Sequence, residues 1–237
     1  MTPQQQLDTA GYLITPPLLD DAELAAIDQQ LNKIPTTGAG QRNLMRQEWC
    51  AALGHQLSAH AALAELLPPD AIAVQCTYFQ KSSENNWLVS LHQDLSIPVA
   101  ERVTHPELTT WSTKDAQLYA QPPAAALAQL LAVRLHLDPC GEHDGALRII
   151  PGSHRSGKLD ADTIQHLRNS EEQITCVISS GSALAMRPLL LHASSKATGT
   201  SRRRVLHFLF APSTLPYGLR WPESTFTELT MDHHVQP

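Results

Sequence analysis

The chain has 237 residues, of which 42% are hydrophobic and 17% charged, values that are ordinary for one globular domain of the larger kind. The net charge of −6, with one short basic run at Arg202-Arg203-Arg204, argues against binding along a nucleic-acid backbone. No run approaches about 18 apolar residues, the polar start at Met1–Gln6 lacks a signal-peptide core, and the four cysteines are widely spaced, so we expect a cytoplasmic protein with no membrane contact.

The N-terminal part predicts a short strand and two helices. Residues 11–14 have the composition of a strand. Asp20 or Asp21 then caps a helix that runs to about Leu31. A second helix is expected over residues 51–67, which are rich in Ala and Leu and are followed by Pro68-Pro69.

The remainder of the chain favours short strands separated by turns. Strands are expected at residues 70–80, 88–94, 130–137, 146–150 and 203–211, and a hairpin over residues 174–186. Residues 95–128 have few strand signals and predict a long loop that acts as a lid over a binding site. Residues 157–171 predict a polar, partly helical insertion.

These elements indicate a mainly β fold with flanking helices, either a sandwich or a jelly roll. No repeat, low-complexity tract or linker divides the chain. We therefore expect a single domain over residues 1–237, with a core at about 7–211 and a C-terminal extension over 212–237.

A His-x-Asp pattern is the first candidate for chemistry. His92 and Asp94 are two residues apart, so on a strand their side chains would project from the same face. A second histidine would complete a facial triad of the kind used by non-haem iron(II) oxygenases, and His192 is the best candidate. The pattern alone leaves the choice open, because His136 and Asp138 form a second copy.

An ordered series of longer motifs resembles the phytanoyl-CoA dioxygenase family of 2-oxoglutarate oxygenases. The matching segments are Asp8–Ile14, Tyr78–Lys81, His92–Asp94, Asp144–His154 and His192–Ser194, with Arg203 eleven residues after His192. The resemblance covers most of residues 7–211. It implies a double-stranded β-helix, the jelly roll of the cupin-like folds.

The resemblance also selects the metal ligands and the cosubstrates. In the family, the first His-x-Asp precedes the Pro-Gly-Ser-His segment and the distal histidine follows it. This order implies that His92, Asp94 and His192 are the catalytic metal ligands. The implied cofactors are Fe(II), 2-oxoglutarate and dioxygen, with ascorbate in a supporting role. The implied reaction is hydroxylation of a small molecule, with succinate and carbon dioxide as co-products.

Four further residues are candidates for binding the cosubstrate. The resemblance assigns Arg203 and Ser194 to the far carboxylate of 2-oxoglutarate, which a planar guanidinium suits, and makes Lys81 a candidate to neutralise a carboxylate. Strand alternation places Arg203 on one face with Val205 and His207.

Arg134 occupies a position that is often apolar or aromatic in the family. It lies on the polar face of a predicted strand, and a buried arginine needs an anion. It therefore favours a contact with the cosubstrate or with a more acidic substrate. Arg202 and Arg204 are interpreted as a solvated basic run.

Two other classes of function remain open. One is a cupin-like hydrolase or isomerase that uses zinc or manganese, since two histidines and a carboxylate also suit zinc. The other is a non-catalytic sensor of a metal or a small acid. Neither the substrate nor the roles of the lid and of insertion 157–171 can be predicted from the sequence.

Overall fold

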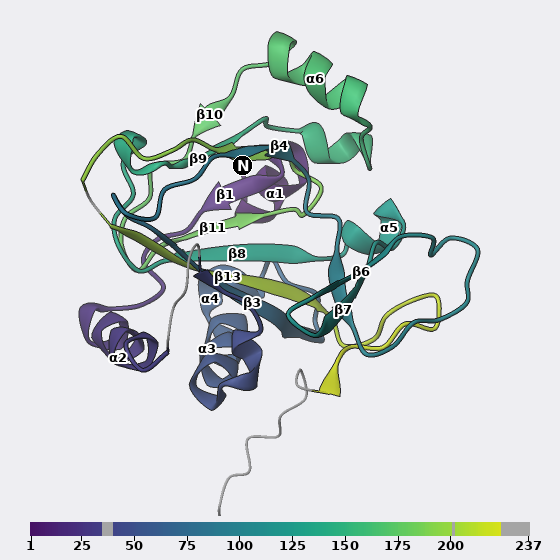
Figure 1. Cartoon of the computed structure of the whole chain (residues 1–237), viewed down its shortest axis with the longest axis horizontal. Coiled ribbons are helices and arrows are strands. Elements are labelled where there is room, and N and C mark those ends of the chain that lie inside the picture. Colours follow the sequence, from purple (N-terminus) through teal and green to yellow (C-terminus); the bar gives the residue numbers. More distant parts are fainter. Residues whose placement is uncertain (35–39, 201, 224–237) are drawn as a thin grey trace, which may run out of the picture.

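The computed structural model describes residues 1–34, 40–200 and 202–223. Strands form a curved core and helices cover it from outside (Figure 1). The α-helices in the described ranges are α1 (Pro3–Ala10), α2 (Asp21–Leu31), α3 (Glu48–Ala59), α4 (Ala61–Ala64), α5 (Ala124–Leu127) and α6 (Ala161–Ser170). Short 3₁₀ turns occur at Leu44–Arg46, Glu142–Asp144 and Ser153–Ser156. None of the described helices is both long and apolar enough to cross a membrane.

The strands form three antiparallel sheets in the described part of the chain. The largest has the spatial order β1 (Tyr12–Ile14), β11 (Ala183–Met186), β8 (Leu131–His136), β13 (Arg203–Pro212), β3 (Ala71–Lys81) and β2 (Gly40–Gln41). The second has the order β10 (Ile174–Thr175), β9 (Leu147–Ile149), β12 (His192–Ser194) and β4 (Val89–His92). The third has the order β5 (Ile97–Val99), β7 (Gln117–Ala120) and β6 (Trp111–Lys114).

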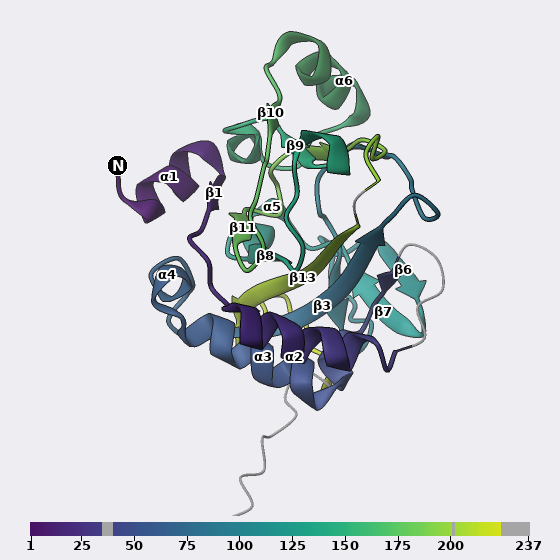
Figure 2. The ribbon, with the colours of Figure 1, turned by 90° about the vertical axis from the view of Figure 1, so that its left-hand side faces the viewer.

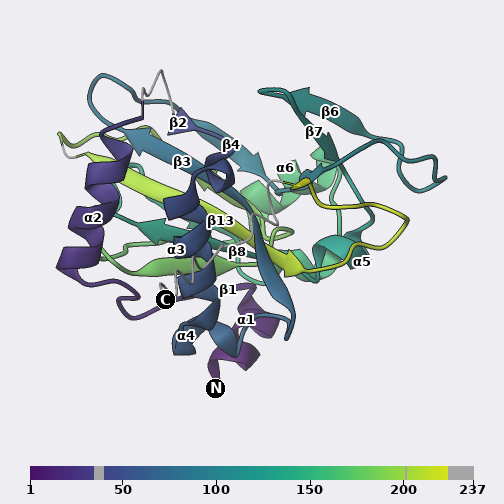
Figure 3. The ribbon, with the colours of Figure 1, turned by 90° about the horizontal axis from the view of Figure 1, so that it is seen from below.

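The large sheet separates the apolar core into two clusters, one on each of its faces. On its outer face, α2 and α3 cover β3 and β13 (Figures 2 and 3), and Phe208 and Phe210 of β13 are fully buried there. The inner face, together with the second sheet, encloses a second apolar cluster that includes Leu147 and Leu209. Polar side chains also lie on this inner face, between the two sheets. The predicted mainly β architecture is confirmed, and the arrangement is a jelly roll of the double-stranded β-helix type.

The N-terminal elements follow their capping signals with one exception. Asp20 caps α2 by accepting a hydrogen bond from the Glu23 amide at 2.9 Å. The predicted helix over residues 51–67 is wrong in extent, because His60 has extended backbone and divides it into α3 and α4. The His60 ring then caps α4 by accepting a hydrogen bond from the Ala62 amide at 3.2 Å.

Two other predicted segments were wrong. Residues 95–128 are not a structureless lid, since β5, β6 and β7 form a small sheet there. Residues 174–186 are not a hairpin, because β10 pairs with β9 whereas β11 pairs with β1 and β8. The chain crosses between sheets at this point, through a turn at Gly181 with a φ of +75°. The insertion over 157–171 is partly helical as predicted and contains α6.

The C-terminal extension lies partly outside the described residues, since 224–237 are not described. Within its described part, Leu219 and Trp221 are each 3% exposed and pack in the second apolar cluster. The packed core therefore continues beyond residue 211.

Candidate functional site

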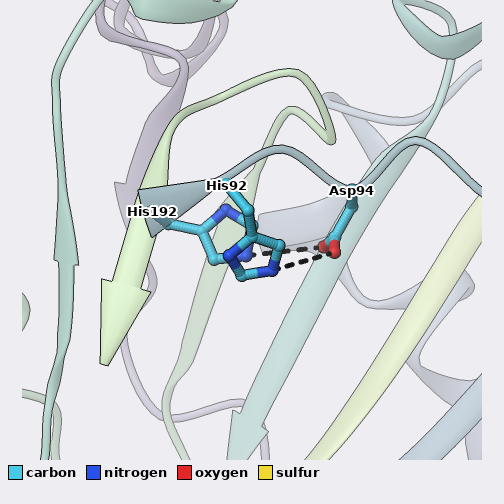
Figure 4. Close-up of side chains that lie close together, drawn as sticks. All are labelled: His92, Asp94 and His192. Atoms are coloured by element: carbon cyan, nitrogen blue, oxygen red, sulfur yellow. Dashed lines mark ion pairs between the residues drawn. The ribbon is translucent and has the colours of Figure 1, made fainter. Parts of the chain in front are cut away.

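Three predicted ligands converge at the edge of the second sheet. His92 and His192 lie directly opposite each other on β4 and β12, so their rings project from the same face, with centroids 4.3 Å apart. The Asp94 carboxylate oxygens lie 3.7 Å from the Nε2 atom of each ring (Figure 4). One ligand atom from each residue lies within 4.8 Å of the others, a spacing that could hold a metal ion.

Asp94 reaches this position from a loop and not from a strand. β4 ends at His92, so the prediction of a strand through residue 94 was wrong. The Asp94 amide leaves the ladder and donates to the Pro188 carbonyl at 2.9 Å. The two histidines and the carboxylate therefore converge through a turn of the backbone, and not through strand alternation alone.

Gln93 fixes this loop, a role that the sequence analysis did not predict. The residue is buried and is part of the lining of a cavity beside the ligands. Its Nε2 atom donates to the carbonyls of Gly157 at 2.8 Å and Leu189 at 2.7 Å, and its Oε1 atom accepts from the Leu159 amide at 2.9 Å. These bonds tie the segment that carries Asp94 to the start of the insertion and to the segment before β12.

The two histidines present their Nε2 atoms in the form that metals bind. The Nδ1 atom of His92 contacts the Ser90 carbonyl at 2.8 Å, and that of His192 contacts the Leu190 carbonyl at 2.9 Å. A carbonyl can only accept, so Nδ1 carries the hydrogen in each ring and Nε2 is left with its lone pair. Burial lowers the pKa of His192 to about 4, which keeps that ring neutral near pH 7. Two such imidazoles and one carboxylate fit a divalent transition metal.

Two chambers meet at these ligands. The inner chamber, of about 230 Å³, lies between the two sheets and contains Arg134, Ser194 and Arg203. The outer chamber, of about 320 Å³, opens toward the third sheet and includes Lys114 from β6. The residues common to both linings are Phe79, His92, Asp94 and His207.

The inner chamber is rich in buried positive charge. Arg203 and Arg134 are 3% and 7% exposed. One Nη atom of Arg203 donates to the Gly145 carbonyl, and the Nε atoms of both arginines are buried without a partner among the described residues. Asp94 is the only carboxylate in the described lining of this chamber. An arginine pair buried in this way is suited to an anionic ligand.

Lys81 and Ser194 form a linked pair at the side of the inner chamber. The Lys81 ammonium donates to Ser194 Oγ and to the Ser195 carbonyl, both at 2.6 Å, and only 1% of the residue is exposed. Burial, assisted by Arg203 and Arg134, lowers the pKa of Lys81 to about 7. Ser194 lines the chamber, whereas Lys81 lies behind it.

The second His-x-Asp copy does not form a metal site among the described residues. His136 is 3% exposed on the inner face of β8, and its Nδ1 atom has no partner in the described part of the chain. Asp138 instead accepts two hydrogen bonds from the Arg204 side chain, at 2.8 and 2.9 Å, and a third from the Arg204 amide at 2.9 Å. Arg204 is 7% exposed and also pairs with Asp28 of α2, so its interpretation as a solvated residue was wrong.

His207, like Gln93, lies near the ligands and was not predicted from the sequence to have a role in the site. Its Nε2 atom lies 3.8 Å from Asp94 Oδ2, and its Nδ1 atom lies 2.6 Å from an Nη atom of Arg134. Strand alternation placed His207 on the same face as Arg203. That signal located it, but the sequence could not show that β8 would place Arg134 opposite it.

Solved structures with the same fold cover most of the chain. AviO1 from Streptomyces viridochromogenes Tue57 has a TM-score of 0.60 and 20% identity, over 90% of this chain and 94% of that one. The non-haem alpha-ketoglutarate-dependent carbocyclase SnoK, from nogalamycin biosynthesis, has a TM-score of 0.65 and 14% identity, over 88% and 82%. HygX from Streptomyces hygroscopicus, with nickel, 2-oxoglutarate and hygromycin B bound, has a TM-score of 0.59 and 16% identity, over 90% and 88%.

No curated protein matches the chain at the sequence level. The family model for phytanoyl-CoA dioxygenase, in contrast, matches residues 7–205. This match spans all the segments that suggested the resemblance, from the N-terminal strand to Arg203, and it is consistent with the fold of the solved structures. The chain belongs to the phytanoyl-CoA dioxygenase family.

Proposed function

We propose that this protein is an oxygenase that depends on iron(II) and 2-oxoglutarate. The observation that carries the proposal is the meeting of two chambers at the candidate ligands, one of them lined by buried arginines. A metal centre between two ligand chambers is what a reaction with a cosubstrate and a separate substrate requires. HygX, which has the same fold, has been solved with iron and with nickel and 2-oxoglutarate.

The ligand set supports iron as the resident metal. His92, Asp94 and His192 would hold it, and three protein ligands leave positions open for the reactants. Iron bound there would supply the activation of dioxygen. The protein's contribution is to keep both Nε2 atoms available through the carbonyl partners on Nδ1, and to fix Asp94 through Gln93.

The inner chamber is the proposed site for 2-oxoglutarate. Arg203 would bind the far carboxylate with its planar fork, assisted by the Ser194 hydroxyl. Lys81 would orient that hydroxyl from behind. Arg134, the second guanidinium in this chamber, would add positive charge that favours a dianionic cosubstrate.

The outer chamber is the proposed site for the primary substrate. Its volume of about 320 Å³ suits a small molecule. Gln75 and Thr77 supply polar groups and Lys114 supplies positive charge, whereas the Arg42 guanidinium is paired with Asp115 at 2.9 Å. Asp94 is again the only carboxylate among the described lining residues, which favours a substrate with an acidic group over a cationic one. The proposed reaction is hydroxylation, with succinate and carbon dioxide as co-products.

A binding measurement tests the proposed cosubstrate site. Calorimetry of 2-oxoglutarate with the protein loaded with Ni(II), an inert substitute for iron, should give saturable binding. Arg203→Ala should weaken it at least tenfold, since a charged hydrogen-bond partner is lost. The matched control is Arg202→Ala, because the Arg202 side chain is 51% exposed and is absent from the chamber lining. Equal affinity for both variants would refute the assignment of Arg203.

A further inference from the structure

Three histidines surround the Asp94 carboxylate at nearly equal distances. The Nε2 atoms of His92 and His192 lie 3.7 Å from its oxygens, and that of His207 lies 3.8 Å away. By distance from Asp94 alone, His207 would be a candidate for a fourth metal ligand. Its nitrogens are not in the described group whose ligand atoms all lie within 4.8 Å of one another, so it could bind the metal only after its ring moved. Imidazole is a strong ligand for transition metals, so some other feature must decide whether His207 binds.

The group that contacts Nδ1 differs between His207 and the other two histidines. The Nδ1 atoms of His92 and His192 face backbone carbonyls and must donate to them. The Nδ1 atom of His207 faces the Arg134 guanidinium at 2.6 Å, and a guanidinium has only donors. In a neutral ring, Nδ1 of His207 must therefore accept, and the hydrogen must be on Nε2, the atom that faces Asp94.

The fold holds this arrangement in place. Arg134 of β8 and His207 of β13 are directly opposite partners in the large sheet, so their side chains project together from its inner face. The Arg134 guanidinium also lies over the Phe79 ring, 5.6 Å from its centroid. Both residues are at least 92% buried, which limits the rotation of either side chain.

We propose that Arg134 holds His207 as the Nε2–H tautomer, so that His207 is a hydrogen-bond donor beside the metal site and not a fourth metal ligand. Asp94 Oδ2 is a suitable acceptor, since it is buried and has no hydrogen-bond partner among the described residues. At 3.8 Å the pair is too long for a hydrogen bond, and a small approach of the ring would form one. His207 is thus a positioning residue for Asp94, and Arg134 keeps a coordination position open.

This inference rests on the proposed metal site and is tested by counting ligands. Pulsed electron paramagnetic resonance of the Cu(II)-loaded protein reports the number of bound imidazoles. The native protein should show two and Arg134→Met three, because loss of the donor releases Nδ1 and allows Nε2 to bind. Arg134→Met/His207→Phe should return the number to two. Arg134→Lys, which retains a donor, should also show two.

Metal affinity gives a second measurement that does not depend on activity. Competition titration should show Ni(II) binding about tenfold tighter to Arg134→Met, a change of the size found when partners of metal ligands are altered. His207→Phe alone, with Arg134 intact, should keep two imidazoles and should weaken Ni(II) binding about tenfold, because Asp94 loses its positioning donor. The proposal is therefore tested even if Arg134→Met does not fold.

Three imidazoles in the native protein would overturn the inference. So would a folded Arg134→Met protein with two imidazoles and native affinity, or a loss of one imidazole in His207→Phe. The variant His92→Ala tests the proposed metal site separately. Because it removes one proposed ligand, the loaded protein should then show one bound imidazole. If the native protein bound no metal, or if His92→Ala bound it unchanged, the metal site itself would be wrong and both proposals would fall.

Discussion

At the scale of single residues, the geometry of the candidate site depends on the hydrogen-bond partners that orient each functional group. His92 and His192 are oriented by carbonyls, and Ser194 is oriented by the Lys81 ammonium. These partners come from distant parts of the sequence, for example 113 residues apart for Lys81 and Ser194. These partners determine the tautomers of the histidine rings and the orientation of the side chains. The identity of a residue alone determines neither.

Lys81 provides a test at this scale. We predict that Lys81→Met weakens 2-oxoglutarate binding about tenfold or more, the size expected for loss of a charged hydrogen bond, because Ser194 then loses its orienting donor. Ni(II) affinity should stay unchanged. The matched control is Lys196→Met, since Lys196 is exposed. Calorimetry on both variants checks the prediction, and an unchanged affinity in Lys81→Met would remove Lys81 from the cosubstrate site.

The sequence predicted residue types better than residue surroundings. It placed His92, Asp94 and His192 together, through the order of family motifs, and the structure brings them within reach of one metal ion. It could not predict Gln93, because a glutamine between two ligands gives no signal until its three backbone partners are known. It also could not distinguish Arg204 from Arg202, since the difference lies in Asp28 on a remote helix.

At the scale of elements, Arg204 connects α2 to the large sheet. It pairs with Asp28 of α2 and with Asp138, which follows β8. The residue is 7% exposed, so its charge depends on these partners. The contact fixes one end of α2 over the outer face of the sheet, opposite the face that carries the chambers.

We predict that Arg204→Met destabilises the protein by about 3 kcal/mol, because two carboxylates lose their largely buried partner. Arg202→Met should cost less than about 1 kcal/mol, since its ion pair with Asp138 is exposed and long, at 3.8 Å. Urea unfolding of both variants measures the difference. Equal values for the two would show that the Arg204 contact does not hold α2.

Gly54 determines how closely α3 approaches β3. A Cβ atom at this position would lie 2.8 Å from the Cβ atom of Ala73, closer than two such atoms pack. We predict that Gly54→Ala destabilises the protein by about 1–3 kcal/mol through overpacking, although alanine favours a helix by about 1 kcal/mol. The reciprocal control, Ala52→Gly on the exposed side of α3, should cost about 1 kcal/mol. Thermal melts of both would decide, and a stabilised Gly54→Ala protein would contradict close packing.

Element boundaries were predicted well where a local sequence signal determines them. They were predicted poorly where pairing with other strands determines them. The cap at Asp20 set the start of α2. The predicted hairpin over residues 174–186 had turn residues and two apolar runs, which are local features. The two runs join different sheets, and no local pattern reports which sheet a strand enters. The prediction of a loop without strands over residues 95–128 was wrong for the same reason, because β5 and β6 are defined by their common neighbour β7.

At the scale of the whole molecule, buried imidazoles connect stability to pH. Burial lowers the pKa of His136 to about 3, of His192 to about 4 and of His207 to about 3. The unfolded chain binds protons near the ordinary value of 6.5. Between pH 6.5 and these lowered values the unfolded state binds more protons, so stability must fall as the pH falls.

We predict that His136→Gln reduces this acid sensitivity. In metal-free protein, His136 should contribute up to about 1.4 kcal/mol of lost stability per pH unit below 6.5, and a residue that does not titrate should remove that contribution. Urea unfolding at pH 6.5, 5.5 and 4.5 measures the slope. Parallel curves for the native protein and His136→Gln would mean that His136 is protonated in the folded state, contrary to its burial without a partner.

We propose that the two chambers and the ligands between them form one oxygenase site. The most direct test is succinate formation from 2-oxoglutarate, with Fe(II), ascorbate and dioxygen, by the native protein and by His92→Ala. We expect slow succinate formation by the native protein even without the primary substrate, dependent on Fe(II) and lost in His92→Ala. Equal succinate formation by both proteins, or none by the native protein together with no binding of 2-oxoglutarate, would contradict the proposal.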